Sequence, residues 1–227
     1  MKIKICGVFR EQDIDYINES RPDYTGFVFA KSKREVSFAQ AGRLKERLAD
    51  GIAAVGVFVN SPIEDIIALY RNGVINIAQL HGDENEEYIT RLKEASGDKP
   101  IPVIQVIKST SLTTEYTEEK SQQITRIETN ENNYLCHSRN SLTHSIDYYL
   151  FDSGAGSGET FDWGLLNSLD IDKPWFLAGG INLDNIKRAM AVNPFGIDVS
   201  GGAETGGVKD RKKIVQLTEM VRKGNMA

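Results

Sequence analysis

The 227-residue sequence predicts an α/β protein, a single-domain (β/α)8 TIM barrel with a polar insertion between its fifth and sixth strands. Short apolar runs rich in β-branched and aromatic residues recur along the chain, helix-like stretches follow most of them, and the runs number eight. Parallel strands need crossovers of a dozen or more residues, which these stretches supply. The alternative, an open doubly wound sheet, usually has five or six strands, so eight runs favour the barrel.

The strands are predicted from where each apolar run begins. The starts are near Ile3, Tyr24, Ala53, Ile75, Pro102, Tyr148, Trp175 and Phe195. The spacings are 21, 29, 22, 27, 46, 27 and 20 residues, and six of the seven match one strand plus one crossover helix. Three helix starts carry signals: a capping group and early proline at residues 60–62, acidic residues at 83–87, and Asn182 before an apolar face.

The long spacing contains a polar stretch at residues 109–147. Of its 39 residues, 19 are Ser, Thr, Asn or Gln, and an ordinary connection would be about 20 residues shorter. We expect a surface excursion within one domain spanning 1–227, and the helix of this unit is placed only by default. The functional alternative is a lid over the site.

Composition excludes several classes of protein. The net charge is −5, the pI is about 5.4, and there is neither a basic stripe typical of nucleic-acid binders nor a run of about 20 apolar residues for a membrane helix. Cys6 and Cys136 form no paired motif, which fits a reducing compartment, so we expect a cytoplasmic protein. No metal-ligand spacing or dinucleotide fingerprint is found, and Cys136-His137 with His144 is interpreted as incidental.

Polar or glycine-rich residues follow the predicted strands, which locates the mouth of the barrel, where enzymes of this fold place their working groups. These strand ends are Cys6-Gly7, residues 31–34, Asn60, residues 81–83, residues 152–158, residues 179–182 and residues 198–202. Two glycine pairs, Gly179-Gly180 and Gly201-Gly202, favour a phosphate held by backbone N–H groups. The alternative is that these glycines only allow tight turns.

Four side chains at these ends are candidates for chemistry. Cys6 is either a thiolate base or nucleophile or a small buried apolar residue. Asp152 follows an apolar run and is either a proton donor or a loop cap. Arg34 is either a bidentate clamp for a carboxylate or solvated surface charge. His81 either orients substrate or transfers protons, or is structural.

Taken in order, the strand ends resemble those of the phosphoribosylanthranilate isomerases, the barrel enzymes of tryptophan biosynthesis. The matching pieces are residues 4–7, 26–29 with 31–34 and Ser37, 55–60, 79–84, 151–153, 156–158, 161–163, 178–185 and 197–204. The resemblance runs from residue 3 to about residue 215, except for the polar excursion. Ala155 stands where the family usually has the first glycine of a pair, so the nearby phosphate loop is expected to differ slightly.

The resemblance implies a cofactor-free Amadori rearrangement of N-(5'-phosphoribosyl)anthranilate to 1-(2-carboxyphenylamino)-1-deoxyribulose 5-phosphate by a monomer or homodimer. Cys6 corresponds to the base that removes the ribose C2 proton, Asp152 to the acid that opens the furanose ring, and Arg34 to the group that holds the anthranilate carboxylate. The implied phosphate contacts are Gly156, Gly179, Gly180, Ser200 and Gly201, and His81 and Asp198 line the pocket.

Two rival functions remain open at this stage. The first is the Amadori isomerase of histidine biosynthesis, which uses paired aspartates and has half-barrel repeats. Cys6 and the lack of an obvious half-repeat argue against it. The second is a non-catalytic barrel that binds a phosphorylated metabolite, which would bind product without turning substrate over.

Overall fold

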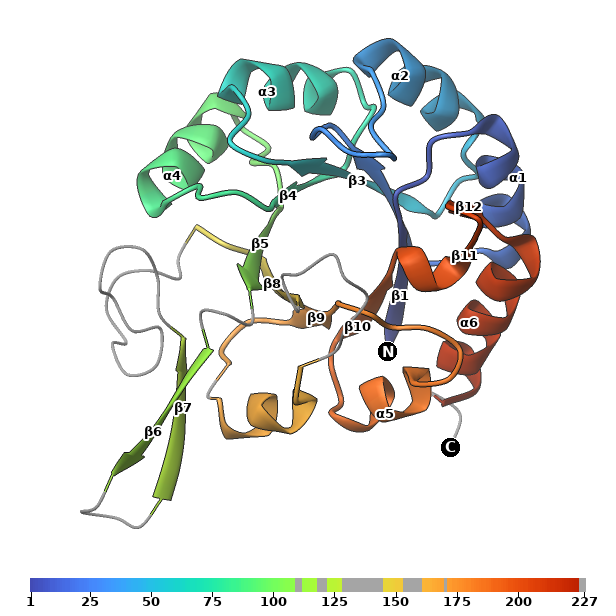
Figure 1. Ribbon diagram of the computed structural model, residues 1–227. Coiled ribbons are helices and arrows are strands. Elements are labelled where there is room, and N and C mark those ends of the chain that lie inside the picture. The colour runs from blue at the N-terminus through green and yellow to red at the C-terminus, as the bar shows by residue number, and fades with distance from the viewer. Residues whose placement is uncertain (109–111, 118–121, 128–144, 153–160, 170, 225–227) are drawn as a thin grey trace.

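The structure is a computed structural model that describes residues 1–108, 112–117, 122–127, 145–152, 161–169 and 171–224. Eight parallel strands close into a barrel in the order β1-β10-β9-β8-β5-β4-β3-β2 (Figure 1). They are β1 (Lys2–Cys6), β2 (Tyr24–Val28), β3 (Ala53–Phe58), β4 (Ile77–Leu80), β5 (Val103–Lys108), β8 (Tyr148–Asp152), β9 (Trp175–Leu177) and β10 (Gly196–Val199). The predicted barrel is confirmed, and each predicted strand start lies within two residues of the observed one.

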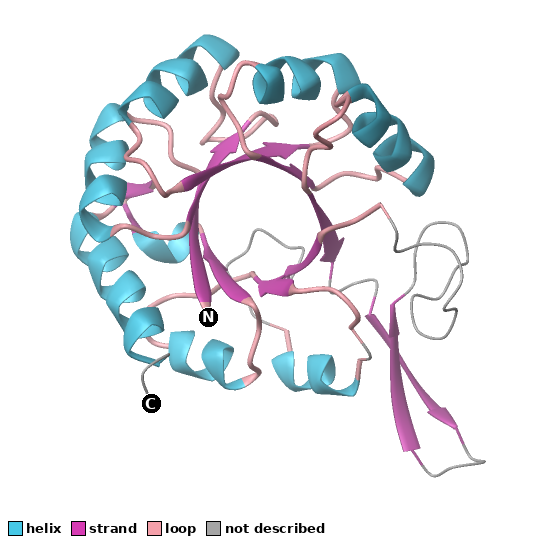
Figure 2. Ribbon diagram, turned by 180° about the vertical axis from the view of Figure 1, so that it is seen from behind, coloured by secondary structure: helices cyan, strands magenta, loops and turns pink. Residues whose placement is uncertain are grey.

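Helices surround the barrel (Figure 2). They are α1 (Glu11–Ser20), α2 (Phe38–Arg47), α3 (Ile63–Arg71), α4 (Glu86–Ala95), α5 (Ile186–Ala191) and α6 (Arg211–Gly224), with 3-10 helices η2 (Trp163–Ser168) and η3 (Gly201–Ala203). The short strands β11 (Glu204–Thr205) and β12 (Val208–Lys209) pair as a ribbon after η3. No helix in the described ranges has the length and apolar character needed to cross a membrane.

The predicted helix starts are confirmed in part. The first turn of α4 is acidic, and the Asn85 side chain accepts a hydrogen bond from the Tyr88 N–H. The side-chain cap expected at residues 60–62 is wrong: no side chain caps the helix, Asn60 has φ +49°, and its side chain instead accepts from the Asp83 N–H. Pro62 takes the N-cap position of α3, so its fixed φ begins that helix without a side-chain cap.

The polar excursion differs from an ordinary βα unit. In place of the helix expected by default, its described part forms an antiparallel hairpin of β6 (Leu112–Thr117) and β7 (Gln122–Ile127), which extends beside the barrel in Figure 1. After β8, the described part of the crossover, residues 161–169 and 171–174, contains the 3-10 helix η2 and no α-helix. Residues 109–111, 118–121 and 128–144 lie outside the described residues, so the lid stays a prediction.

Strand alternation separates two apolar layers. Inside the barrel a compact cluster is formed by Val55, Ile77, Ile104, Val106, Leu150, Phe176 and Ala178. The larger cluster lies between strands and helices and includes Ile3 and Ile5 of β1. Because side chains alternate along a strand, Lys4 and Cys6 lie on the opposite face of β1 from these isoleucines, toward the barrel interior.

Candidate active site

The carboxyl ends of four strands bring four of the predicted site residues to one end of the barrel. Cys6 ends β1, His81 follows β4, Asp152 ends β8, and Asp198 lies one residue before the end of β10. All eight barrel strands are parallel, so these ends meet at the same mouth. The expectation that the candidates lie at the mouth is therefore confirmed in geometry, while their individual roles remain predictions.

A buried lysine that the sequence analysis did not single out lies below the mouth. The Lys4 side chain has no exposed surface, and its Nζ donates to Asp198 Oδ2 at 2.9 Å. Lys4 and Asp198 are direct neighbours in the β1–β10 register. Asp198 Oδ1 is buried without a hydrogen-bond partner among the described residues. The pair therefore carries one further buried acceptor, the second carboxylate oxygen of Asp198.

The protonation of Cys6 depends on burial and on Lys4. Burial raises the pKa of the Cys6 thiol above its usual value, and the Lys4 ammonium opposes that rise. Asp198 adds to the rise, and Lys209 adds to the opposition. Gly26 of β2 makes room for the thiol, since a Cβ there would lie 2.7 Å from Cys6 Sγ. The raised pKa favours the thiol form of Cys6 at neutral pH.

His81 and Asp152 lie next to each other across the mouth. His81 Nε2 is 3.7 Å from Asp152 Oδ2, and both side chains are partly exposed. Burial lowers the pKa of His81, and Asp152 opposes that change only in part. The imidazole is therefore neutral at neutral pH, and it can accept or donate one hydrogen bond beside the Asp152 carboxyl.

Arg34 is held by a carboxylate that the sequence analysis gave no role. Arg34 Nε and Nη2 donate to Glu204 Oε1 and Oε2 at 2.6 and 2.8 Å. Lys209 Nζ, fully buried, also donates to Glu204 at 2.6 Å. Burial opposes the ionisation of Glu204, but the hydrogen bonds from Arg34 and Lys209 outweigh it and lower its pKa. The alternative interpretation of Arg34, as solvated surface charge, is therefore wrong.

Sequence position alone could have revealed only one of these added residues. Lys4 interrupts an apolar strand two residues before Cys6, so the alternation of a strand places both on one face. Glu204 and Lys209 come from the ribbon after η3 and meet Arg34 from 170 residues away in the chain. No local pattern predicts a contact of that separation.

The glycine-rich loops after β9 and β10 touch each other. Gly179 and Gly180 have φ values of +86° and +64°, a conformation that favours glycine. A Cβ on Gly202 would lie 1.9 Å from the Ile181 carbonyl oxygen, so the two loops pack in direct contact. Asn185 Nδ2 donates to the Gly180 carbonyl oxygen at 2.9 Å and fixes the first loop. The paired loops predicted to hold phosphate therefore lie side by side.

Ser200 and Gly201 complete this edge of the mouth. Ser200 Oγ would lie 3.3 Å from a Cβ on Gly7, and Gly201 would place a Cβ 3.7 Å from Arg34 Nη2. The second loop thus borders both the end of β1 and Arg34. Gly156, the remaining predicted phosphate contact, lies outside the described residues.

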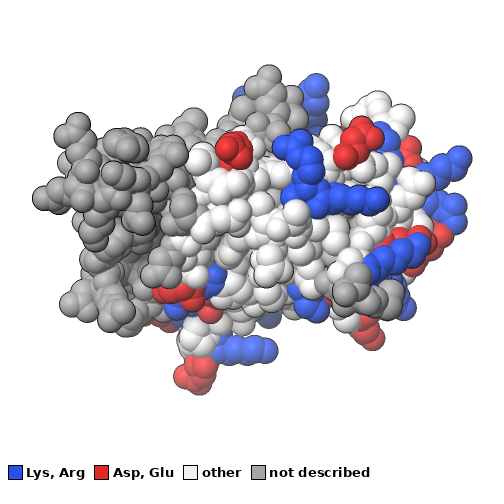
Figure 3. Space-filling view, turned by 90° about the horizontal axis from the view of Figure 1, so that it is seen from below, with Lys and Arg blue, Asp and Glu red and all other residues white. Residues whose placement is uncertain are grey.

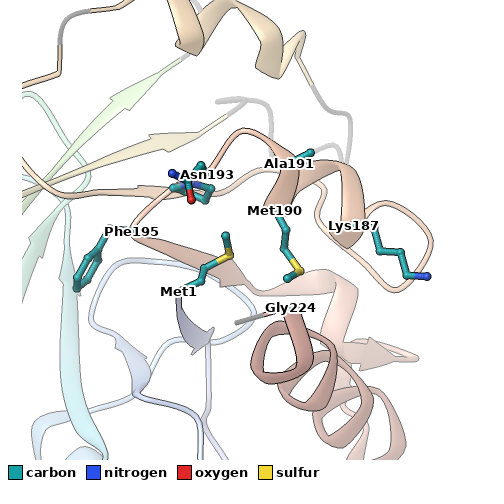
Figure 4. A pocket seen from close by; sticks show the side chains of 8 residues that line it. Met1, Lys187, Met190, Ala191, Asn193, Phe195 and Gly224 are labelled. Atoms are coloured by element: carbon teal, nitrogen blue, oxygen red, sulfur yellow. The ribbon is translucent and has the colours of Figure 1, made fainter. Parts of the chain in front are cut away.

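A separate pocket lies at the other end of the barrel strands. It is lined by Met1, Lys187, Met190, Ala191, Asn193, Pro194, Phe195 and Gly224 (Figure 4). Met1 and Phe195 precede β1 and β10, whose carboxyl ends carry the candidate site. None of the predicted site residues lines this pocket. In Figure 3, much of the described surface on the face shown is uncharged, and Lys and Arg as well as Asp and Glu form small separate groups on it.

In sequence, the chain is similar to isomerases of one kind. The family model described as N-(5'-phosphoribosyl)anthranilate (PRA) isomerase matches residues 3–125 and 98–220. N-(5'-phosphoribosyl)anthranilate isomerase of Endomicrobium trichonymphae is 39% identical over 227 residues, covering 97% of this chain and 98% of that protein. The same enzyme of Clostridium acetobutylicum is 40% identical over 231 residues, covering 98% of each.

Solved structures agree. TrpF from Jonesia denitrificans has a TM-score of 0.76 and 26% identity, covering 99% of this chain and 98% of its own. A crystal structure of phosphoribosyl anthranilate isomerase in complex with reduced 1-(o-carboxyphenylamino)-1-deoxyribulose 5-phosphate has a TM-score of 0.72 and 29% identity, covering 98% and 99%. The chain therefore belongs to the N-(5'-phosphoribosyl)anthranilate isomerase family.

Proposed function

We propose that this barrel performs the isomerisation of its family, the Amadori rearrangement of N-(5'-phosphoribosyl)anthranilate in tryptophan biosynthesis, with Cys6 as general base and Asp152 as general acid. One observation supports the assignment of these two residues: Cys6 and Asp152 end different strands of the parallel barrel at the same mouth. One acid and one base suffice for the reaction, so no cofactor is required.

The steps follow from the positions of the two groups. Asp152 gives a proton to the furanose ring oxygen, the C1–O bond breaks, and the nitrogen lone pair forms a C1=N iminium. The iminium acidifies the C2 hydrogen, which the Cys6 thiolate removes. The electrons of that C–H bond form C1=C2 while the iminium pair returns to nitrogen. Loss of the C2 hydroxyl proton and protonation at C1 then give the ketone product.

Binding at both ends would hold the reacting carbons between acid and base. Arg34 takes the carboxylate of the anthranilate ring, and His81 and Asp198 line the centre of the pocket. The phosphate is held by Gly179, Gly180, Ser200 and Gly201, together with Gly156. Fixing both ends converts the encounter of base and C2 hydrogen into an intramolecular step. The chain acts as one domain on a phosphorylated small molecule in the cytoplasm.

The direct test is turnover of N-(5'-phosphoribosyl)anthranilate by purified protein, followed as loss of anthranilate fluorescence. We expect Cys6→Ser and Asp152→Asn each to lower kcat by at least about a hundredfold, the lower part of the range for acid–base groups. Asp50→Asn is the matched control, because Asp50 is exposed and precedes β3 at the other end of the barrel.

The outcomes separate the rival functions. Turnover of the histidine-pathway substrate in place of the anthranilate substrate would reject the proposal. Binding of product without any turnover would indicate a binding protein. Near-normal kcat in either site variant would reject the role of that residue.

A further inference from the structure

The guanidinium of Arg34 is bound to protein along only one of its two edges. Glu204 occupies the edge formed by Nε and Nη2, at 2.6 and 2.8 Å. A guanidinium carries five N–H donors in one plane, and Nη2 has a second N–H that points with Nη1 along the other edge. In the described part of the chain, no side-chain hydrogen bond of Arg34 other than these two is found. The Nη1–Nη2 edge can therefore receive a second carboxylate.

Neighbouring groups restrict where that second edge points. The Arg34 stem lies across Gly7, since a Cβ on Gly7 would be 2.4 Å from Arg34 Cδ. Glu204 is itself fixed from behind by Lys209 Nζ, which also donates to the Ser200 carbonyl oxygen at 3.1 Å. Glu204 and Lys209 are buried, whereas the Arg34 side chain is 32% exposed. The partly exposed Arg34 side chain is thus held by two buried residues that are hydrogen-bonded to each other.

The charges of this cluster also call for an anion. Arg34 and Lys209 contribute two positive charges, and Glu204 contributes one negative charge between them. The cluster formed by these three residues has one positive charge in excess. A planar carboxylate on the open edge of Arg34 would neutralise that charge with two parallel hydrogen bonds.

We propose that Glu204 is a positioning residue that fixes Arg34 by its Nε–Nη2 edge and thereby presents the Nη1–Nη2 edge to the carboxylate on the aromatic ring of the substrate. This rests on the proposed function. Without Glu204, the long arginine side chain regains rotamer freedom, and that freedom is lost again each time substrate binds. Selectivity for a carboxylated ring therefore depends on a residue that does not touch the substrate.

The test compares two ligands that differ only in the carboxylate. One is N-(5'-phosphoribosyl)anthranilate, and the other is N-(5'-phosphoribosyl)aniline, used as a competitive inhibitor whether or not it turns over. For Glu204→Gln we expect KM for the anthranilate substrate to rise by roughly tenfold, equivalent to about one charge-assisted hydrogen bond. The inhibition constant of the aniline analogue should change by less than about twofold, because the carboxylate contact is absent from it.

Glu204→Asp is a second variant, included in case Glu204→Gln fails to fold. It keeps a negative charge for buried Lys209 but is one methylene shorter, so it cannot pair with Arg34 in the same bidentate geometry. We expect the same rise in KM from it. Glu19→Gln is the matched control, since Glu19 makes a similar bidentate pair with Arg211 on the exposed surface. Its KM should equal that of the unmodified protein.

A double-mutant cycle with Arg34→Ala completes the experiment. Arg34→Ala should raise KM, and adding Glu204→Gln to it should raise KM no further, because the positioned group is already gone. Equal losses for both ligands, additive effects in the cycle, or an unchanged KM in both Glu204 variants would overturn the proposal. Lack of turnover by the unmodified protein would instead reject the proposed function.

Discussion

Cys6 lies where burial and a neighbouring cation act on its proton in opposite directions. Burial raises the pKa of the thiol, and the Lys4 ammonium opposes the rise. A base must be deprotonated to accept the C2 proton, so kcat/KM should rise with pH as the thiolate forms. Lys4, which donates to Asp198, is therefore expected to influence the rate through the protonation of Cys6.

Replacing Lys4 tests this electrostatic role. In Lys4→Met the cation that favours the thiolate is gone, so the pKa of Cys6 rises further and the increase in kcat/KM should move to higher pH. The measurement is the kcat/KM profile between about pH 6 and pH 10, the range around an ordinary thiol pKa. Asp198 loses its partner in this variant, so the folded state is verified by circular dichroism at each pH.

Lys2→Met is the matched control for that prediction. Lys2 lies on the same strand two residues earlier, but its side chain is exposed and pairs with Asp23 away from the thiol. Its profile should overlay that of the unmodified protein. An unshifted profile in Lys4→Met would show that Lys4 does not set the thiolate population.

The site could be predicted from sequence only as far as strand ends define it. Cys6 and Asp152 were predicted because an apolar run stops at each of them, and parallel strands bring such ends together. Strand alternation places Lys4 on the same face as Cys6, but the ion pair that buries Lys4 needs Asp198, which only the closed β1–β10 pairing supplies. The role of Glu204 depends on its contact with Arg34, which lies 170 residues away in the chain.

The loop after β9 and the loop after β10 are in direct contact and therefore form one unit. Gly202 has no room for a side chain: a Cβ would lie 1.9 Å from the Ile181 carbonyl oxygen and 2.9 Å from Asn182 Cα. Backbone atoms cannot move aside as a flexible side chain can. Any substitution at Gly202 must therefore separate the two loops.

Gly202→Ala should consequently weaken substrate binding. Displacing the loops by the order of 1 Å moves the expected phosphate contacts, and misplacement of that size can cost about a hundredfold in rate. We expect KM for the substrate and the inhibition constant of inorganic phosphate to rise together. A rise in KM without weaker phosphate inhibition would place the phosphate elsewhere.

Gly42→Ala serves as the control for the added methyl group. Gly42 lies within α2, and apart from its chain neighbours and the nearby backbone of that helix, no heavy atom of the described residues lies within 4 Å of the position that its Cβ would occupy. This substitution should stabilise the protein by roughly 0.5–1 kcal/mol, since alanine favours a helix interior, and leave KM unchanged.

The strands of the barrel could be predicted better than the segments that connect them. Strand starts were recovered because apolar runs in a parallel barrel are continuous and bounded by polar residues. The paired strands β6 and β7 were not predicted, because their polar sequences lack the alternating apolar face that identifies a strand. The predicted side-chain cap at residues 60–62 was wrong because the Asn60 side chain instead accepts a hydrogen bond from the Asp83 N–H, in the loop after β4.

The last strand and the last helix of the barrel pack against the first strand and the first helix. β10 pairs with β1, and α6 lies along α1 beside it (Figure 1). α6 buries Ile214, Leu217 and Val221, while α1 buries Ile14 and Ile17. α6 also contacts β1, the first strand of the barrel. Stability of the entire fold should therefore respond to changes in this C-terminal helix.

Leu217→Ala tests that dependence. Leu217 has no exposed surface, so truncation removes buried contacts and leaves a cavity, which should lower the free energy of unfolding by about 2–5 kcal/mol. For a chain of this length, Tm should fall by roughly 4–20 °C. Gln216→Ala, one residue earlier on the exposed face, should change stability by less than about 0.5 kcal/mol. Because Leu217 lies outside the candidate site, kcat at 25 °C should match the unmodified protein. A stable variant with normal Tm would show that the barrel closes without tight packing of α6, whereas a lower kcat at equal folded fraction would link this helix to the mouth.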